Sequence, residues 1–148
     1  MNFASEGFFV AAFEGMATNQ QLIRSSLCLN QKKVMPNVVL YPVALGPKRD
    51  KCFTFSGVIN RGDGVTMCGM RDEEEARRKV PAEYELRGSM QQFRLDDLLD
   101  EEVKLLKMDV EGYEPEVMQG ATKLLERNKV RLMLLCRWPE AFGNVLIF

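Results

Sequence analysis

Two carboxylates, Asp109 and Glu111, follow a short apolar run at residues 103–108 and directly precede Gly112. In open α/β sheets, ligands bind beyond the carboxyl ends of the strands. Acids at such a place can hydrogen-bond a hydroxyl group, or remove its proton if burial raises the pKa of one of them. Acids also favour a helix N-terminus without any catalysis, so capping is the alternative role. Two carboxylates are too few ligands to predict a metal site.

A third acid, Glu14, ends an apolar run at residues 8–13. In nucleotide-binding α/β folds, an acid at this place commonly accepts hydrogen bonds from the ribose, because one carboxylate matches two adjacent hydroxyls. The alternative for Glu14 is a solvent-facing acid in a turn.

The elements that position these acids are two predicted βαβ units. In the later one, the apolar run at 103–108 predicts a buried strand, and apolar positions from Val117 to Leu125 at helical spacing predict a helix that ends near Asn128. A second apolar run at 130–135 predicts a parallel strand. In the earlier unit we expect a strand at 8–13, a helix with Thr18 as N-cap, and a strand at 38–45.

The stretch from 47 to 93 is less informative. Residues 52–55 predict a short strand, 56–69 a glycine-containing loop, and 72–79 a solvated helix. Residues 83–86 and 90–93 predict strands, with a hairpin turn at 87–89 between them.

Composition bounds the function. The 148 residues and the 46% apolar share predict a single domain (1–148), and the net charge of −1 gives no reason to expect nucleic acid as a partner. The absence of histidine excludes triads and metal sites built on histidine. The four cysteines form no CxxC pair, so we expect reduced core residues. No signal peptide or membrane span is predicted, and a cytoplasmic location is expected.

Three separated pieces carry a family resemblance: RLDDLL from Arg94, DVEG from Asp109, and the pair Gly120-Ala121. In this order and spacing, they resemble the signature of the FkbM-type methyltransferases. The resemblance implies a Rossmann-like, mostly parallel sheet with flanking helices and S-adenosylmethionine as the cofactor.

The resemblance also assigns residues. It implies Asp109 and Glu111 as catalytic residues, and Glu14, Asn19, Ala44 and Asp109 as cofactor-binding residues. The family usually has proline after the acid of its second strand, where this chain has Gly15. The implied reaction is O-methylation of a small-molecule or glycan hydroxyl, and the oligomeric state is left open.

Compared with that family, we expect this domain to be incomplete. The family's first strand and glycine-rich loop would precede residue 8, and we expect the C-terminal end to lack the further strands of such a sheet. The alternative function is therefore a non-catalytic methyltransferase-like remnant or a protein-interaction module. A nucleotide-binding α/β module that uses another cofactor is a further alternative.

Overall fold

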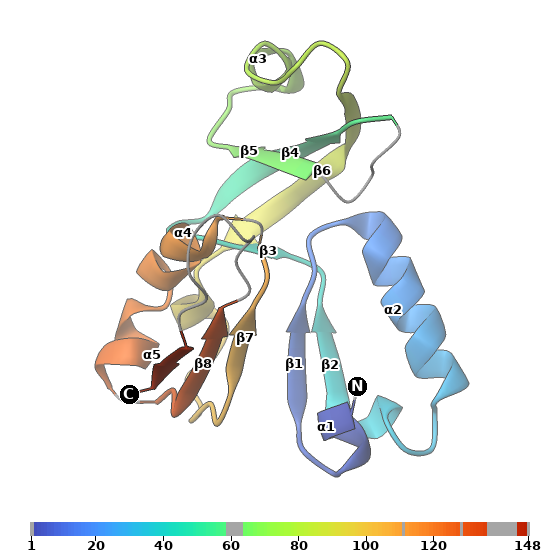
Figure 1. Ribbon diagram of the computed structural model, residues 1–148, viewed down its shortest axis with the longest axis vertical. Helices are drawn as coiled ribbons and strands as arrows, with labels where there is room; N and C mark the ends of the chain where they lie inside the picture. The colour runs from blue at the N-terminus through green and yellow to red at the C-terminus, as the bar shows by residue number, and fades with distance from the viewer. Residues whose placement is uncertain (1, 59–63, 111, 128, 136–144, 148) are drawn as a thin grey trace. The chain divides into compact units, whose positions relative to one another are not determined.

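The computed structural model describes residues 2–58, 64–110, 112–127, 129–135 and 145–147, and these residues form both helices and strands (Figure 1). The chain divides into two units, one formed by Met1–Ala44 with Asp50–Gln92 and the other by Leu45–Arg49 with Phe93–Phe148. Each unit is described by itself. Among the described residues, no helix combines the length and the apolar character that crossing a membrane requires.

The first unit begins with a parallel pair of strands. After the short α1 (Asn2–Ser5), β1 (Val10–Phe13) runs parallel to β2 (Val38–Tyr41), and α2 (Ala17–Leu29) and the 3-10 helix η1 (Met35–Asn37) connect them. Leu27 of α2 is buried with Ala4 and Val34, and the three pack against one side chain from each strand, Val10 and Val38. The predicted earlier βαβ unit is thus confirmed, with a shorter first strand. The single strand predicted at 38–45 was wrong, because β2 ends at Tyr41 and Ala44–Leu45 form β3 of another sheet.

Most of a four-stranded sheet also lies in this unit. Its strand order is β3-β6-β4-β5, with β3 at Ala44–Leu45, β4 at Asp50–Ser56, β5 at Gly64–Cys68 and β6 at Glu85–Phe93. β4 pairs antiparallel with both β5 and β6. The predicted helix is α3 (Glu73–Arg77), and the Asp72 carboxylate caps it by accepting the Glu75 N–H at 2.8 Å.

Two expectations for this region were wrong. Residues 64–68 form a strand rather than part of a loop, and β6 runs straight through the predicted hairpin turn. Gly88 provides the reason, because it lies within β6 at φ 150° next to a shift in register between Thr54 and Phe55. The glycine therefore marks an irregularity within one strand and not a reversal of the chain.

The sheet has an apolar face and a polar face. Phe53 and Phe55 are buried with Ala76 on one face, whereas Cys52, Thr54 and Ser56 alternate with them and are also buried. Cys52 is bonded to Cys68 in a disulfide, which corrects the expectation of reduced cysteines. Reading residues 56–69 as a loop hid the antiparallel pairing that places these two cysteines opposite each other. Cys28 is free and exposed rather than in the core, and Cys136 lies outside the described residues.

The second unit contains the other parallel pair. β7 (Leu106–Met108) runs parallel to β8 (Leu132–Leu135), and β9 (Val145–Ile147) pairs antiparallel with β8. The single predicted helix is two helices, α4 (Glu114–Gln119) and α5 (Thr122–Glu126), with Gly120 as the C-cap of the first. Met108, Val117 and Met133 are buried together, so α4 covers the β7–β8 pair. The 3-10 helix η2 (Leu95–Asp97) precedes β7.

The α/β class and both parallel pairs are confirmed. The described strands form sheets of two, four and three strands, and two of these sheets contain antiparallel pairs. One continuous, mostly parallel sheet is therefore not what these strands form, and the Rossmann-like arrangement stays a prediction.

Candidate functional site

Glu14 lies directly after β1, and its carboxylate is held in place from two sides. Oε1 accepts the backbone N–H of Met16 at 2.7 Å, and Oε2 accepts the Nδ2–H of Asn19 at 3.2 Å. A carboxylate offers about four acceptor positions, so these bonds orient the group and leave acceptor capacity for a ligand. Glu14 is half-buried and Asn19 is exposed. Two of the predicted cofactor residues, Glu14 and Asn19, are thus brought into direct contact.

Gln20 is a member of this turn that the sequence did not single out. Its Nε2 donates to the carbonyl of Glu14 at 2.8 Å and to that of Gly15 at 3.2 Å. The prediction that Thr18 caps the helix was wrong, because α2 begins at Ala17 and its N-cap, Met16, makes no side-chain cap. The side chains of Asn19 and Gln20 instead donate hydrogen bonds to Glu14 and Gly15 of the turn. Two adjacent amide side chains shortly after an acid were the sequence feature that could have predicted these bonds.

Gly15 stands where the resembled family usually has proline, and the contact with Met90 explains this difference. A Cβ at position 15 would lie 1.9 Å from the sulfur of Met90 on β6. No side chain, proline included, fits there unless Met90 moves. Glycine at position 15 and methionine at position 90 are therefore matched in size.

Ala44 begins β3, and it is half-buried in the same unit as Glu14. The preceding residue, Val43, donates its N–H to the carbonyl of Tyr41 at 2.9 Å, so the chain turns tightly between β2 and β3. The cofactor contact predicted for Ala44 stays a prediction.

Asp109 stands directly after β7, as expected for an acid at a strand end. Its Oδ2 forms an ion pair with Lys107 Nζ at 3.0 Å, and the two side chains are 52% and 55% exposed. The carboxylate is therefore accessible to solvent and partly neutralised, an arrangement that suits orienting a polar ligand. Gly112 adopts φ 92°, a conformation that favours glycine. Glu111 lies outside the described residues.

Glu114 is the most unusual side chain near this turn. It is 4% exposed, and its Oε1 accepts the Val110 N–H at 3.4 Å, which is long for a hydrogen bond. Its buried Oε2 has no hydrogen-bond partner within the described part of the chain. Buried polar atoms are nearly always satisfied, so this oxygen is a candidate ligand contact. The sequence showed only an acid in the first turn of a helix, because burial cannot be read from that pattern.

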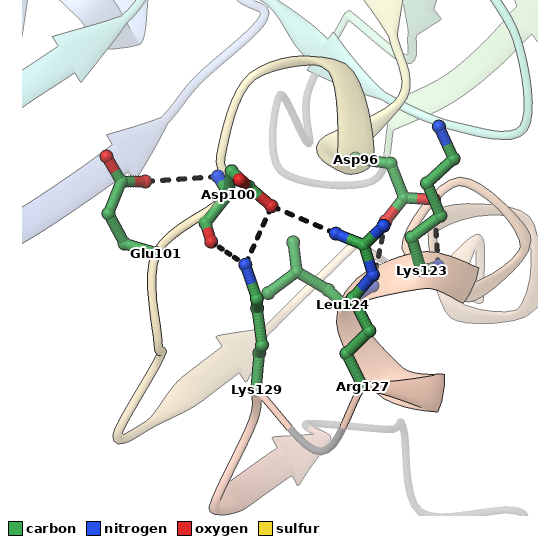
Figure 2. A network of polar contacts seen from close by, with 7 residues as sticks. All are labelled: Asp96, Asp100, Glu101, Lys123, Leu124, Arg127 and Lys129. Atoms are coloured by element: carbon green, nitrogen blue, oxygen red, sulfur yellow. Dashed lines mark hydrogen bonds and ion pairs between the residues drawn. The ribbon is translucent and has the colours of Figure 1, made fainter.

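Asp96, within the resembled RLDDLL segment, has a structural role in this unit (Figure 2). Its side chain is fully buried, and its two oxygens accept the N–H groups of Lys123 and Leu124 at 3.0 and 3.1 Å. Asp96 therefore caps the first turn of α5 from a distant segment. Arg94 donates to the same carboxylate at 2.8 Å.

Asp100 forms the second centre of the network in Figure 2, where Lys129 and Arg127 approach its carboxylate at 2.7 and 3.3 Å. The hydrogen bond from Lys129 holds the pKa of Asp100 below its ordinary value of 3.8. Lys129 Nζ also donates to the Asp100 carbonyl, which ties the end of α5 to the segment before β7. This network is fully explained by packing of the chain and needs no ligand.

Glu14, Asn19 and Ala44 belong to one unit, and Asp109 belongs to the other. The cofactor-binding and catalytic roles that the resemblance assigns to these residues stay predictions.

Comparison with known proteins gives a consistent result. The sequence model of the methyltransferase FkbM domain matches residues 7–146. No curated protein matches the sequence. The crystal structure of Methyltransferase FkbM from Methylobacillus flagellatus KT is similar, with a TM-score of 0.55 and 16% identity over 86% of this chain. At that identity the likeness concerns the fold alone, and this chain spans 25% of that protein's length. Because the family match extends over nearly the whole sequence, the chain belongs to the methyltransferase FkbM domain family.

Proposed function

We propose that this chain binds S-adenosylmethionine and forms part of an enzyme that methylates a hydroxyl oxygen of a small molecule or glycan. The observation that carries the proposal is the carboxylate of Glu14, held by Met16 and Asn19 at the end of a parallel strand in a chain of this family. We further propose the Rossmann-like fold that the family resemblance implies.

The residues at the Glu14 turn fit a nucleoside. Two acceptor positions of the carboxylate are used within the turn, and the remaining ones match the adjacent hydroxyls of a ribose. Gln20 fixes the backbone carbonyls of Glu14 and Gly15, so the carboxylate stands on a rigid turn. Backbone near Ala44 would contact the adenine. When bound, the cofactor supplies an electrophilic methyl group on a sulfonium, and the protein supplies alignment.

Asp109 would act on the acceptor side. Its exposed carboxylate can accept a hydrogen bond from the acceptor hydroxyl and orient its oxygen, while Lys107 limits the negative charge at the site. As the hydroxyl oxygen becomes alkylated, its proton would pass to a carboxylate oxygen of Asp109 or Glu111. The buried Oε2 of Glu114, which has no hydrogen-bond partner among the described residues, supports a ligand near this turn.

The test is calorimetric titration of the chain with S-adenosylmethionine. We expect saturable binding, and Glu14→Ala should weaken it by roughly 10- to 100-fold, because hydrogen bonds to a charged group contribute about 1.5–3 kcal/mol. Asn19→Ala should weaken it less, since it only loosens the carboxylate. Glu6→Ala is the matched control, because Glu6 is an exposed acid of the same unit.

The outcomes separate the alternatives. Absence of heat at millimolar S-adenosylmethionine from a chain with a folded circular-dichroism spectrum would contradict the proposal and favour a non-catalytic module. Preferential binding of NAD or ATP would instead indicate a nucleotide-binding module with another cofactor. Methyl transfer to hydroxyl compounds is then measured with labelled cofactor, where Asp109→Asn should lower turnover more than it lowers cofactor affinity.

A further inference from the structure

Cys52 and Cys68 face each other across two antiparallel strands. They are directly opposite in the register of β4 and β5, they are joined by a disulfide, and 16 positions separate them in the sequence. Cys52 is fully buried, whereas Cys68 is half-buried. A small thiol in solution can therefore reach the sulfur of Cys68 more easily than that of Cys52.

A third side chain, Gln92 of β6, completes the group. It is 1% exposed, and its Oε1 lies 3.2 Å from the sulfur of Cys68 and 3.7 Å from the sulfur of Cys52. Sulfur atoms in a disulfide carry no hydrogen, so this oxygen accepts nothing from them in the bonded state. When the pair is reduced, both thiols become weak donors, and the same oxygen is placed to accept from them. The site thus places an oxygen that can accept hydrogen bonds from the two thiols of the reduced pair.

We propose that Cys52 and Cys68 form a reversible dithiol–disulfide site that exchanges with low-molecular-weight thiols and disulfides. This inference concerns the β4–β5 hairpin and is independent of the proposed methyl transfer.

The exchange balances in two steps. A small thiolate attacks the Cys68 sulfur, which forms a mixed disulfide and releases Cys52 as a thiolate that takes up a proton. A second small thiolate then attacks the small-molecule sulfur of the mixed disulfide. This step forms a small-molecule disulfide and releases Cys68 as a thiolate, which takes up a proton. Two electrons pass from two small thiols to the protein, and the reverse sequence oxidises it. Gln92 stabilises the reduced pair through S–H···O contacts.

The test is a redox titration of the full chain in buffers of reduced and oxidised glutathione. Free thiols are trapped by rapid alkylation, and the peptides that contain residues 52 and 68 are counted by mass spectrometry. We expect both cysteines to change together in one two-thiol transition. Cys28→Ser, which removes the exposed free cysteine among the described residues, should leave that transition unchanged.

Gln92→Leu tests the acceptor. The ratio of reduced to oxidised glutathione at the midpoint should rise about threefold or more. The reason is that the reduced pair loses its hydrogen-bond acceptor, so the disulfide becomes harder to reduce. Gln91→Leu is the matched control, since Gln91 is exposed on the same strand, and it should not shift the midpoint.

The titration of the unmodified chain decides the proposal even if a variant fails to fold. A pair that stays bonded in excess reduced glutathione would show a fixed crosslink and overturn reversibility. If Cys52 or Cys68 is alkylated without the other in oxidised glutathione, the two do not act as a pair and the proposal is overturned. Equal shifts in Gln92→Leu and Gln91→Leu would remove the role of Gln92. None of these outcomes depends on S-adenosylmethionine binding, so this proposal and the proposed function fail separately.

Discussion

Gly120 packs against the backbone of Gly46 with no space for a side chain between them. A Cβ on Gly120 would lie 2.0 Å from the Gly46 carbonyl oxygen and 3.3 Å from the Cα of Arg94. The carbonyl of Gly120 also accepts the N–H of Asp96 at 3.0 Å. Two separated pieces of the family signature, the segment from Arg94 and the pair Gly120-Ala121, are therefore in contact. This contact is a packing contact within the second unit.

Gly120→Ala should destabilise the chain strongly. The added methyl group meets backbone, which cannot move aside as a flexible side chain can, so we expect a loss of at least about 2 kcal/mol in the free energy of unfolding. Urea denaturation measures it. Gly64→Ala is the control, because a Cβ there meets no atom nearer than 3.7 Å. Equal stability of the two variants would contradict the packing argument.

Asp96→Ala should cost about 2–4 kcal/mol in the free energy of unfolding, because it removes the cap of α5 and leaves Arg94 without its carboxylate. Asp96→Asn should cost less, since an amide oxygen still accepts one N–H. Asp97→Ala, at the exposed neighbour, should stay within about 0.5 kcal/mol of the unmodified chain. Unchanged stability of Asp96→Ala would mean that the motif serves a ligand rather than the helix.

Sequence patterns predicted the parts of the fold that depend on one segment at a time. The apolar runs at 8–13 and 103–108 contain the parallel strands β1 and β7, and continuous apolar residues are typical of strands in parallel sheets. Irregularities depend on distant contacts and were missed. The break between α4 and α5 follows from Asp96 capping the second helix, and the continuity of β6 follows from its pairing with β4.

In the candidate site, too, residues marked by a local pattern were predicted and residues defined by their contacts were missed. Glu14 and Asp109 were found because acids after apolar runs mark strand ends. Gln20 and Glu114 were missed, because their importance comes from a bond back to a turn and from burial. Neither property has a periodic signal in the sequence.

Gly15 and Met90 should behave as a coupled pair. Gly15→Ala alone should destabilise the chain by about 1–3 kcal/mol, because the Met90 sulfur occupies the position that the new Cβ needs. In a Met90→Ala background the same change should cost much less, which gives a coupling energy of about 1 kcal/mol or more in a double-mutant cycle. Additive effects of the two changes would show that Met90 does not determine the size of residue 15.

The Asp100–Lys129 contact should make stability depend on pH in the acid range. The hydrogen bond from Lys129 lowers the pKa of Asp100 in the folded chain below 3.8, so the folded state favours the charged carboxylate. Its contribution is therefore complete above the unfolded pKa and is lost as the pH falls through the folded pKa. The difference in stability between the unmodified chain and Asp100→Asn should be constant near neutral pH and shrink below pH 3.8. High salt should reduce it, because the Asp100 side chain is 84% exposed. A difference that does not change at acid pH would exclude this contact as its source.

Glu114→Leu should separate stability from function at the turn after β7. The buried Oε2 has no partner among the described residues, and an unsatisfied buried polar atom costs about 1–3 kcal/mol, so an apolar side chain of similar size should leave the unfolding free energy unchanged or higher. If that oxygen is retained for a ligand, the same variant should bind cofactor or acceptor more weakly, which calorimetry and turnover measure. Glu116→Leu, on the same helix but less buried, is the control and should alter neither property. A large loss of stability in Glu114→Leu would instead show that the bond to Val110 holds the turn, and that Glu114 is structural.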